Sequence, residues 1–163
     1  MPERYLEGNR FLYINSSLGA DELLLESFTG EEAISRLFSF QLELWSENAA
    51  IKFEDILGQG ISFGVVGLEG GEPRHINGIV TSFTQLPGTF RLAHYRATVS
   101  PKIWVLTRKH DLRIFQGQKV DEILKKVLQG FDVSWELHKS YHKREYCVQY
   151  RETDFNFISR LME

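Results

Sequence analysis

The chain has 163 residues, of which 42% are hydrophobic and 13% aromatic, so it is long and apolar enough to pack the core of one domain or slightly more. Its formal net charge of −3 argues against a nucleic-acid-binding domain, which normally carries a strong basic excess. The single cysteine cannot form an internal disulfide. The charged N-terminus lacks the apolar core of a signal peptide, and no stretch approaches the ~20 apolar residues of a membrane span. We therefore expect synthesis and folding in the cytoplasm.

The first hundred residues predict short strands separated by turns. Along residues 38–45, Phe38, Phe40, Leu42 and Leu44 alternate with polar residues and Trp45, which is the period of a strand with one buried face. Similar patterns predict strands over residues 11–14, 23–29, 61–68, 75–86 and 90–99. We expect a hairpin connection at residues 69–73 and a helical turn at residues 53–57 closed by Gly58.

Six or so closely spaced strands with almost no helix favour an antiparallel barrel or sandwich. A closed barrel has the advantage of removing exposed strand edges.

After Pro101 the pattern changes to mixed helix and strand. Apolar residues at helical spacing predict a helix over residues 119–129, ending at Gly130, with acidic residues in its first turn and lysines later. A short strand is expected at residues 133–137 and a polar turn at residues 138–144.

The last nineteen residues predict a strand followed by a capped helix. Tyr146, Val148 and Tyr150 alternate with Glu145, Cys147 and Gln149 in the pattern of a half-buried strand. Thr153 is the expected N-cap, with Asp154 beside the positive end of the helix dipole. Phe155, Ile158, Leu161 and Met162 form the apolar helix face. No capping residue follows, so we expect a fragment of a longer protein, cut in or just after a helix.

The predicted fold class is therefore mainly β with an α+β portion. Residues 1–100 are expected to form an antiparallel β-barrel unit. Residues 101–163 are expected to begin a second, α+β unit that is truncated at its C-terminus.

Histidine and cysteine spacing offers one weak metal-binding pattern. His138 and His142 precede Cys147 by nine and five positions, which matches no strong zinc signature, so we expect the histidines on a solvated turn. Cys147 lies in mid-strand, with neither a helix N-terminus nor a glycine-rich elbow to activate it. We interpret it as a structural cysteine.

The other polar groupings are equally unspecific. The adjacent carboxylates Glu54 and Asp55, like Glu31 and Glu32, are expected to be solvated, and Gly58-x-Gly60 lacks the strand and helix of a dinucleotide loop. Arg108, Lys109 and Arg113 form a small basic cluster near Trp104 and Phe115, which either contacts an acidic partner or solvates the surface. We predict no catalytic, cofactor-binding or metal-binding residues and no cofactor, and we interpret the chain as a structural or assembly module, not an enzyme.

Several linked motifs carry a more specific resemblance. They are LFSFQL at 37–42, DILG at 55–58, HINGIV at 75–80, YRA at 95–97, WVLTR at 104–108, RIFQ at 113–116 and EYCVQYRETDF at 145–155. In this order they make the chain resemble the N-terminal part of the VgrG (Rhs-element Vgr) proteins, the spike proteins of type VI secretion, which are similar to the baseplate hub of contractile phages. Two departures are Leu112, where the family often has cysteine, and Asp121, where proline commonly opens the helix.

The resemblance implies a structural role with defined partners. It implies a homotrimer in the full-length protein, with two barrel-like units per subunit in a pseudo-sixfold ring that docks on the hexameric secretion tube protein. Further implied partners are baseplate and effector proteins, with no nucleic acid and no membrane insertion, and the protein would leave the cell through the type VI apparatus.

Three alternatives remain at this point. One is a ligand-binding or enzymatic barrel that uses its interior. Another is a phage tail baseplate hub protein. The third is a single-strand nucleic-acid-binding barrel, which would need a basic groove with exposed aromatic residues.

Overall fold

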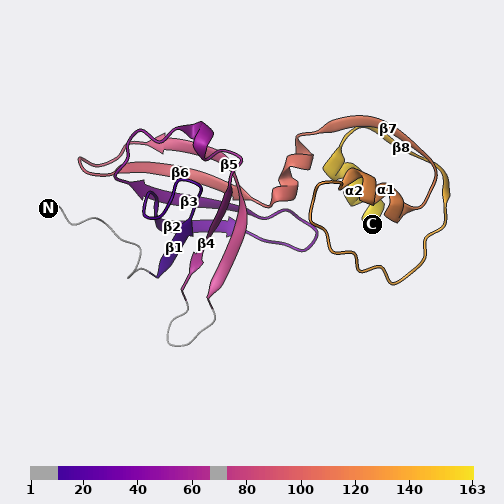
Figure 1. Cartoon of the computed structure of the whole chain (residues 1–163), viewed down its shortest axis with the longest axis horizontal. Helices are drawn as coiled ribbons and strands as arrows, with labels where there is room; N and C mark the ends of the chain where they lie inside the picture. The colour runs from indigo at the N-terminus through magenta and orange to yellow at the C-terminus, as the bar shows by residue number, and fades with distance from the viewer. Residues whose placement is uncertain (1–10, 67–72) are drawn as a thin grey trace. The chain divides into compact units, whose positions relative to one another are not determined.

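The computed structural model describes residues 11–66 and 73–163, and the chain divides into two units, Met1–Lys102 and Ile103–Glu163 (Figure 1). The first unit is built from strands β1 (Leu12–Asn15), β2 (Leu24–Glu31), β3 (Ser39–Ser46), β4 (Gly60–Val65), β5 (Arg74–Leu86) and β6 (Ala93–Ser100). The second contains strands β7 (His110–Gln118) and β8 (Arg144–Thr153) and helices α1 (Val120–Val127) and α2 (Asp154–Met162), and a 3₁₀ helix, η3 (Lys102–Thr107), precedes β7.

The six strands of the first unit form one antiparallel sheet in the order β1-β4-β5-β6-β3-β2. β1 and β2 stand at opposite ends of this order and yet contact each other, so the sheet curls into a nearly closed barrel. The predicted antiparallel barrel is confirmed. A curled sheet of this kind leaves little strand edge uncovered, which limits unwanted pairing with other chains.

Alternating side chains of facing strands fill the interior of the barrel. Phe40 and Leu42 on β3 are paired with Val99 and Ala97 on β6, and all four are buried. Phe63 lies among them, with its ring in edge contact with Phe28 and Phe40. Barrels with few strands are usually filled in this way by their own side chains.

The helical turn of the first unit agrees with its prediction, whereas one strand begins later than predicted. The helical turn is a 3₁₀ helix, η2 (Phe53–Asp55), and Gly58 follows with a φ of 75°, as predicted. The strand predicted from residue 90 begins only at Ala93, because Thr89 and Leu92 close a turn through hydrogen bonds and leave Phe90 fully exposed. The predicted hairpin connection at residues 69–73 lies almost entirely outside the described residues.

In the second unit, both helices pack against one face of the antiparallel β7–β8 pair. Phe115 on β7 stacks on Phe157 of α2, with 5.7 Å between ring centroids, and Cys147 on β8 is buried in the same core. Both predicted helices are confirmed, but α2 buries Phe157 with Ile158 and Leu161, whereas Met162, which the sequence pattern placed on the apolar face, is 61% exposed. Thr153 caps α2, since its Oγ1 accepts a hydrogen bond from the backbone N–H of Asn156 at 3.0 Å.

Two features of the second unit differ from expectation. The strand predicted at residues 133–137 is wrong, because this segment pairs with no strand: the sheet of this unit contains only β7 and β8. Val133 and Trp135 nevertheless pack partly against the core. The alternation predicted for residues 145–150 is confirmed, yet Cys147 and Gln149 face the core while Tyr146 and Tyr150 face outward.

Candidate assembly surface

The side of the β7–β8 sheet that faces away from the helices is apolar. The register places Leu112 opposite Tyr150 and Ile114 opposite Val148, with Tyr146 beyond them opposite Gln116. Leu112, Ile114, Tyr146 and Tyr150 are exposed to 59%, 66%, 67% and 64%, and Val148 is half-buried. We call these five residues the outer face. A sheet that carries apolar side chains on both faces is built to be covered on both.

A buried carboxylate supports this sheet from its inner side. Asp154, the first residue of α2, has no exposed surface, and its Oδ1 accepts a hydrogen bond from Gln149 Nε2 at 2.8 Å. Its Oδ2 lies 3.3 Å from Arg113 Nη2 and 3.5 Å from Lys109 Nζ, and its backbone N–H donates to the Lys109 carbonyl at 2.8 Å. One side chain thus joins β7, β8 and α2, so it holds the outer face in position.

The three residues of the predicted basic cluster make two different kinds of contact. Lys109 and Arg113 face Asp154, whereas the guanidinium of Arg108 lies 5.8 Å from the ring centroid of Trp104. Arg113 also pairs with Asp111 at 2.6 Å. The backbone N–H of Leu112 and then Arg113 hold the pKa of Asp111 below its ordinary value.

The histidines and the cysteine of the weak metal pattern lie in different environments. His138 and His142 are exposed in the segment before β8, whereas Cys147 is buried in the core of the second unit. Over residues 11–66 and 73–163, no three histidine, cysteine or acidic side chains are grouped closely enough to hold a metal ion.

The predicted carboxylate pairs are solvent-exposed. Glu54 and Asp55 belong to η2, and Glu31 and Glu32 lie at the end of β2, where Glu32 pairs with Arg74. These pairs lie on the barrel surface, as expected for solvated carboxylates. Gly60 begins β4 and opens no helix, so Gly58 and Gly60 do not form a dinucleotide loop.

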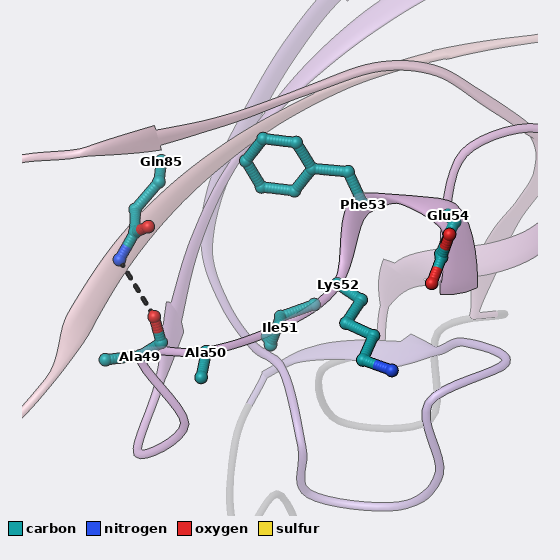
Figure 2. A pocket seen from close by; sticks show the side chains of 7 residues that line it. All are labelled: Ala49, Ala50, Ile51, Lys52, Phe53, Glu54 and Gln85. Atoms are coloured by element: carbon teal, nitrogen blue, oxygen red, sulfur yellow. Dashed lines mark hydrogen bonds between the residues drawn. The ribbon is translucent and has the colours of Figure 1, made fainter.

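The first unit carries a surface hollow between η2 and β5 (Figure 2). It has a volume of about 410 Å³ and is lined by residues 49–54 and Gln85. Gln85 Nε2 donates to the Ala49 carbonyl at 3.2 Å across one side, and the Phe53 ring packs edge-on against Phe83. The hollow is wide open to solvent, and Lys52, Glu54 and Gln85 contribute to its lining, so it differs from the enclosed apolar clefts that bury most of a small ligand.

Neither helix of the second unit, nor any other helix in the described part of the chain, is long and apolar enough to cross a membrane.

Comparison with known proteins gives consistent matches. The family model of the phage tail baseplate hub (GPD) matches residues 31–163. The chain is 44% identical over 165 residues to the type VI secretion system spike protein VgrG1c of Pseudomonas aeruginosa, and 46% identical over 157 residues to VgrG1a of the same organism. These matches cover 99% and 94% of this chain but only 23% and 24% of the two relatives, so the chain spans about a quarter of their length.

A solved structure supports the same relationship. The E. coli c3393 protein, described as a component of the type VI secretion system with structural similarity to the T4 bacteriophage tail proteins gp27 and gp5, matches with a TM-score of 0.72 and 28% identity. The match covers 86% of this chain and 42% of that protein.

Proposed function

Because this chain belongs to the phage tail baseplate hub (GPD) family, we propose that it forms the hub part of a type VI secretion spike, which trimerises in the full-length protein and docks on the hexameric secretion tube. The observation that carries this proposal is the match along 99% of the chain to a spike protein at 44% identity. In this proposal the protein is made in the cytoplasm and leaves the cell through the type VI apparatus, together with effector proteins.

The geometry supports an assembly role better than a catalytic one. The barrel interior is packed with its own side chains, and the buried carboxylate of Asp154 is occupied by Arg113, Lys109 and Gln149. What remains available is an apolar sheet face, which suits the contacts between proteins that a spike requires.

We assign residues 1–100 to the first barrel unit of the hub and residues 101–163 to the beginning of its second unit. The separate cores of the two units support this assignment, since one is built only from residues 14–99 and the other only from residues 106–161. The chain covers only about a quarter of the two relatives, which supports a longer protein whose further segments complete the spike.

In-frame deletion of the codons for residues 1–163 from the intact gene tests the proposal. We expect loss of tube-protein secretion into the medium, with restoration by the wild-type gene and by a control carrying Phe90→Ser at an exposed turn. The purified intact protein should sediment as a trimer. Normal secretion without this region would contradict the proposed role.

The family description also favours a second candidate, a hub of a contractile phage tail. The two roles differ in where the protein is found. A phage hub would be recovered in tail particles after prophage induction, whereas a spike protein would be recovered with the secreted tube protein in uninduced cultures.

A further inference from the structure

We propose that the outer surface of β1, β4 and β5 binds a neutral oligosaccharide, in a hollow lined by asparagine and serine side chains beside Tyr13. We call it the amide hollow, and its polar lining consists of Asn15, Ser16, Ser17, Ser62 and Asn77. The hollow has a volume of about 500 Å³, within the range of about 300–1,000 Å³ that ligand sites occupy. Such a site would add a binding activity to the structural role proposed above, and neither depends on the other.

The pairing of three strands places the key side chains in one row. Asn15 on β1 is paired with Ser62 on β4, and Ser62 is paired with Asn77 on β5. Phe63, the next residue of β4, is buried in the barrel core, so the row lies on the opposite, outer side of the sheet. The row therefore crosses the surface of the barrel at a right angle to its strands.

The two carboxamides of this row are available to a ligand. Asn15 and Asn77 are exposed, and no residue in the described part of the chain hydrogen-bonds to either side chain. Each carboxamide offers two N–H donors and an acceptor oxygen. Two strand spacings separate them, which is about 10 Å and matches two linked hexose rings better than one.

The lining of the amide hollow carries no charge. None of its residues is ionisable, although 25% of the chain consists of aspartate, glutamate, lysine and arginine. The hollow between η2 and β5 differs in this respect, because Lys52 and Glu54 line it. A nucleic acid or an acidic glycan would need basic groups for its phosphates or carboxylates. The lining therefore fits an uncharged ligand.

An aromatic pair lies beside the row. Tyr13 and His75 occupy the neighbouring row, on either side of Gly64, and their ring centroids are 5.3 Å apart. The Tyr13 hydroxyl is hydrogen-bonded to His75 Nδ1 and to the Ser62 side chain. A Cβ at Gly64 would lie 2.8 Å from this hydroxyl, so the glycine lets the phenol cross β4. The ring is thus held in a fixed position next to the amide hollow.

Carboxamides beside a fixed aromatic ring match the two surfaces of a sugar. A pyranose carries hydroxyls around its edge, which carboxamides bind, and apolar C–H groups on its faces, which pack on an aromatic ring. Burial raises the pKa of Tyr13 above its ordinary value, so the phenol adds no charge at neutral pH. The outer strand faces of other small barrels also bind oligosaccharides.

Saturation-transfer difference NMR on the intact protein tests this site. The probes are cellotriose, maltotriose and chitotriose, which are neutral and differ in linkage or in their N-acetyl groups. We expect transfer to the ring C–H protons of at least one of them, and a titration of that probe gives its Kd.

Two variants locate the binding on the surface of the barrel. Asn15→Ala combined with Asn77→Ala should weaken binding about tenfold, because it removes hydrogen bonds from both ends of the row. Tyr13→Leu should reduce transfer to the C–H protons, because it replaces the aromatic ring with an aliphatic side chain. Asn156→Ala is the matched control, since Asn156 is an exposed asparagine of the second unit, and it should bind as wild type does.

Three results would overturn the proposed site. They are an absence of transfer to all three probes, an unchanged Kd in the double asparagine variant, and stronger binding of a heparin-derived trisaccharide or of the oligonucleotide (dT)6 than of any neutral probe. The double variant should sediment and unfold as wild type does, because neither asparagine contacts another described side chain. Loss of sugar binding with normal secretion of the tube protein would show that this site is separate from the spike role.

Discussion

At the scale of single residues, the buried carboxylate of Asp154 is predicted to contribute strongly to stability. Its carboxylate is fully buried and meets one neutral and two cationic donors. Asp154→Asn removes the negative charge and leaves Arg113 without its buried partner. Breaking a fully buried ion pair costs about 3–5 kcal/mol, and because Arg113 and Lys109 also reach solvent we expect a loss of about 2 kcal/mol from the stability of the second unit.

Native-state hydrogen exchange in α2 and β8 measures this change locally, which matters for a chain of two units. Asp111→Asn is the matched control, since Asp111 pairs with the same Arg113 at the surface. Faster exchange should appear in the Asp154 variant only. Equal protection in the two variants would show that the buried carboxylate contributes little.

At the scale of elements, the close pairing of β5 and β6 depends on Gly78. A Cβ at this position would lie 2.6 Å from the Ser100 carbonyl oxygen and 2.6 Å from Val99 Cγ1. Gly78→Ala should therefore destabilise the barrel by about 2 kcal/mol, as overpacking does elsewhere. Gly60 on the neighbouring strand has nothing within 4 Å of the same added carbon, so Gly60→Ala is the control.

Amide exchange in β3 and β6 reads out this prediction. We expect the Gly78 variant to lose protection throughout the barrel and the Gly60 variant to stay within about 0.5 kcal/mol of wild type. A neutral Gly78→Ala would mean that β5 and β6 can separate locally without cost.

Strands and helices whose apolar residues recur with a regular strand or helix spacing were predictable from the sequence. The strand over Phe40–Leu44 and helix α1 each bury the face that their pattern indicates. Strand β7 was not predicted, because its inward residue Arg113 is polar and its outward residues Leu112 and Ile114 are apolar. The inward position of Arg113, whose side chain is 24% exposed, makes sense only once Asp154 is nearby, and that proximity arises from tertiary packing.

The same reason explains the reversed faces of β8. Gln149 is fully buried because its amide donates to Asp154, so a polar side chain takes the core position while Tyr146 and Tyr150 face outward. At residues 133–137 the sequence predicts a strand that the structure does not contain. Val133 and Trp135 alternate like a strand because they pack on the core, and a strand also requires a hydrogen-bonding partner, which a sequence pattern does not specify.

At the scale of the whole molecule, the two units have separate cores, and the core of the first unit is enclosed by more secondary structure than the core of the second. The barrel core includes Leu42, Phe63 and Tyr95, and its strands pair around a nearly closed sheet. The second unit has one strand pair and two short helices, and its outer face is exposed. A domain of about 60 residues buries only about 60% of the surface of its unfolded chain, so its stability is marginal even with a well-covered core.

We therefore expect the two units to behave differently when they are produced separately. Residues 1–102 should give a dispersed NMR spectrum and unfold cooperatively in urea, because their core is complete without residues 103–163. Residues 103–163 should bind a hydrophobic dye such as ANS and unfold over a broad range of urea, because Ile114 and the two outward tyrosines remain uncovered. The intact 163-residue chain, measured in parallel, is the reference. If residues 103–163 instead unfold as sharply as the barrel and bind no dye, the outer face needs no cover for stability, and the physical reason for a partner at this surface is removed.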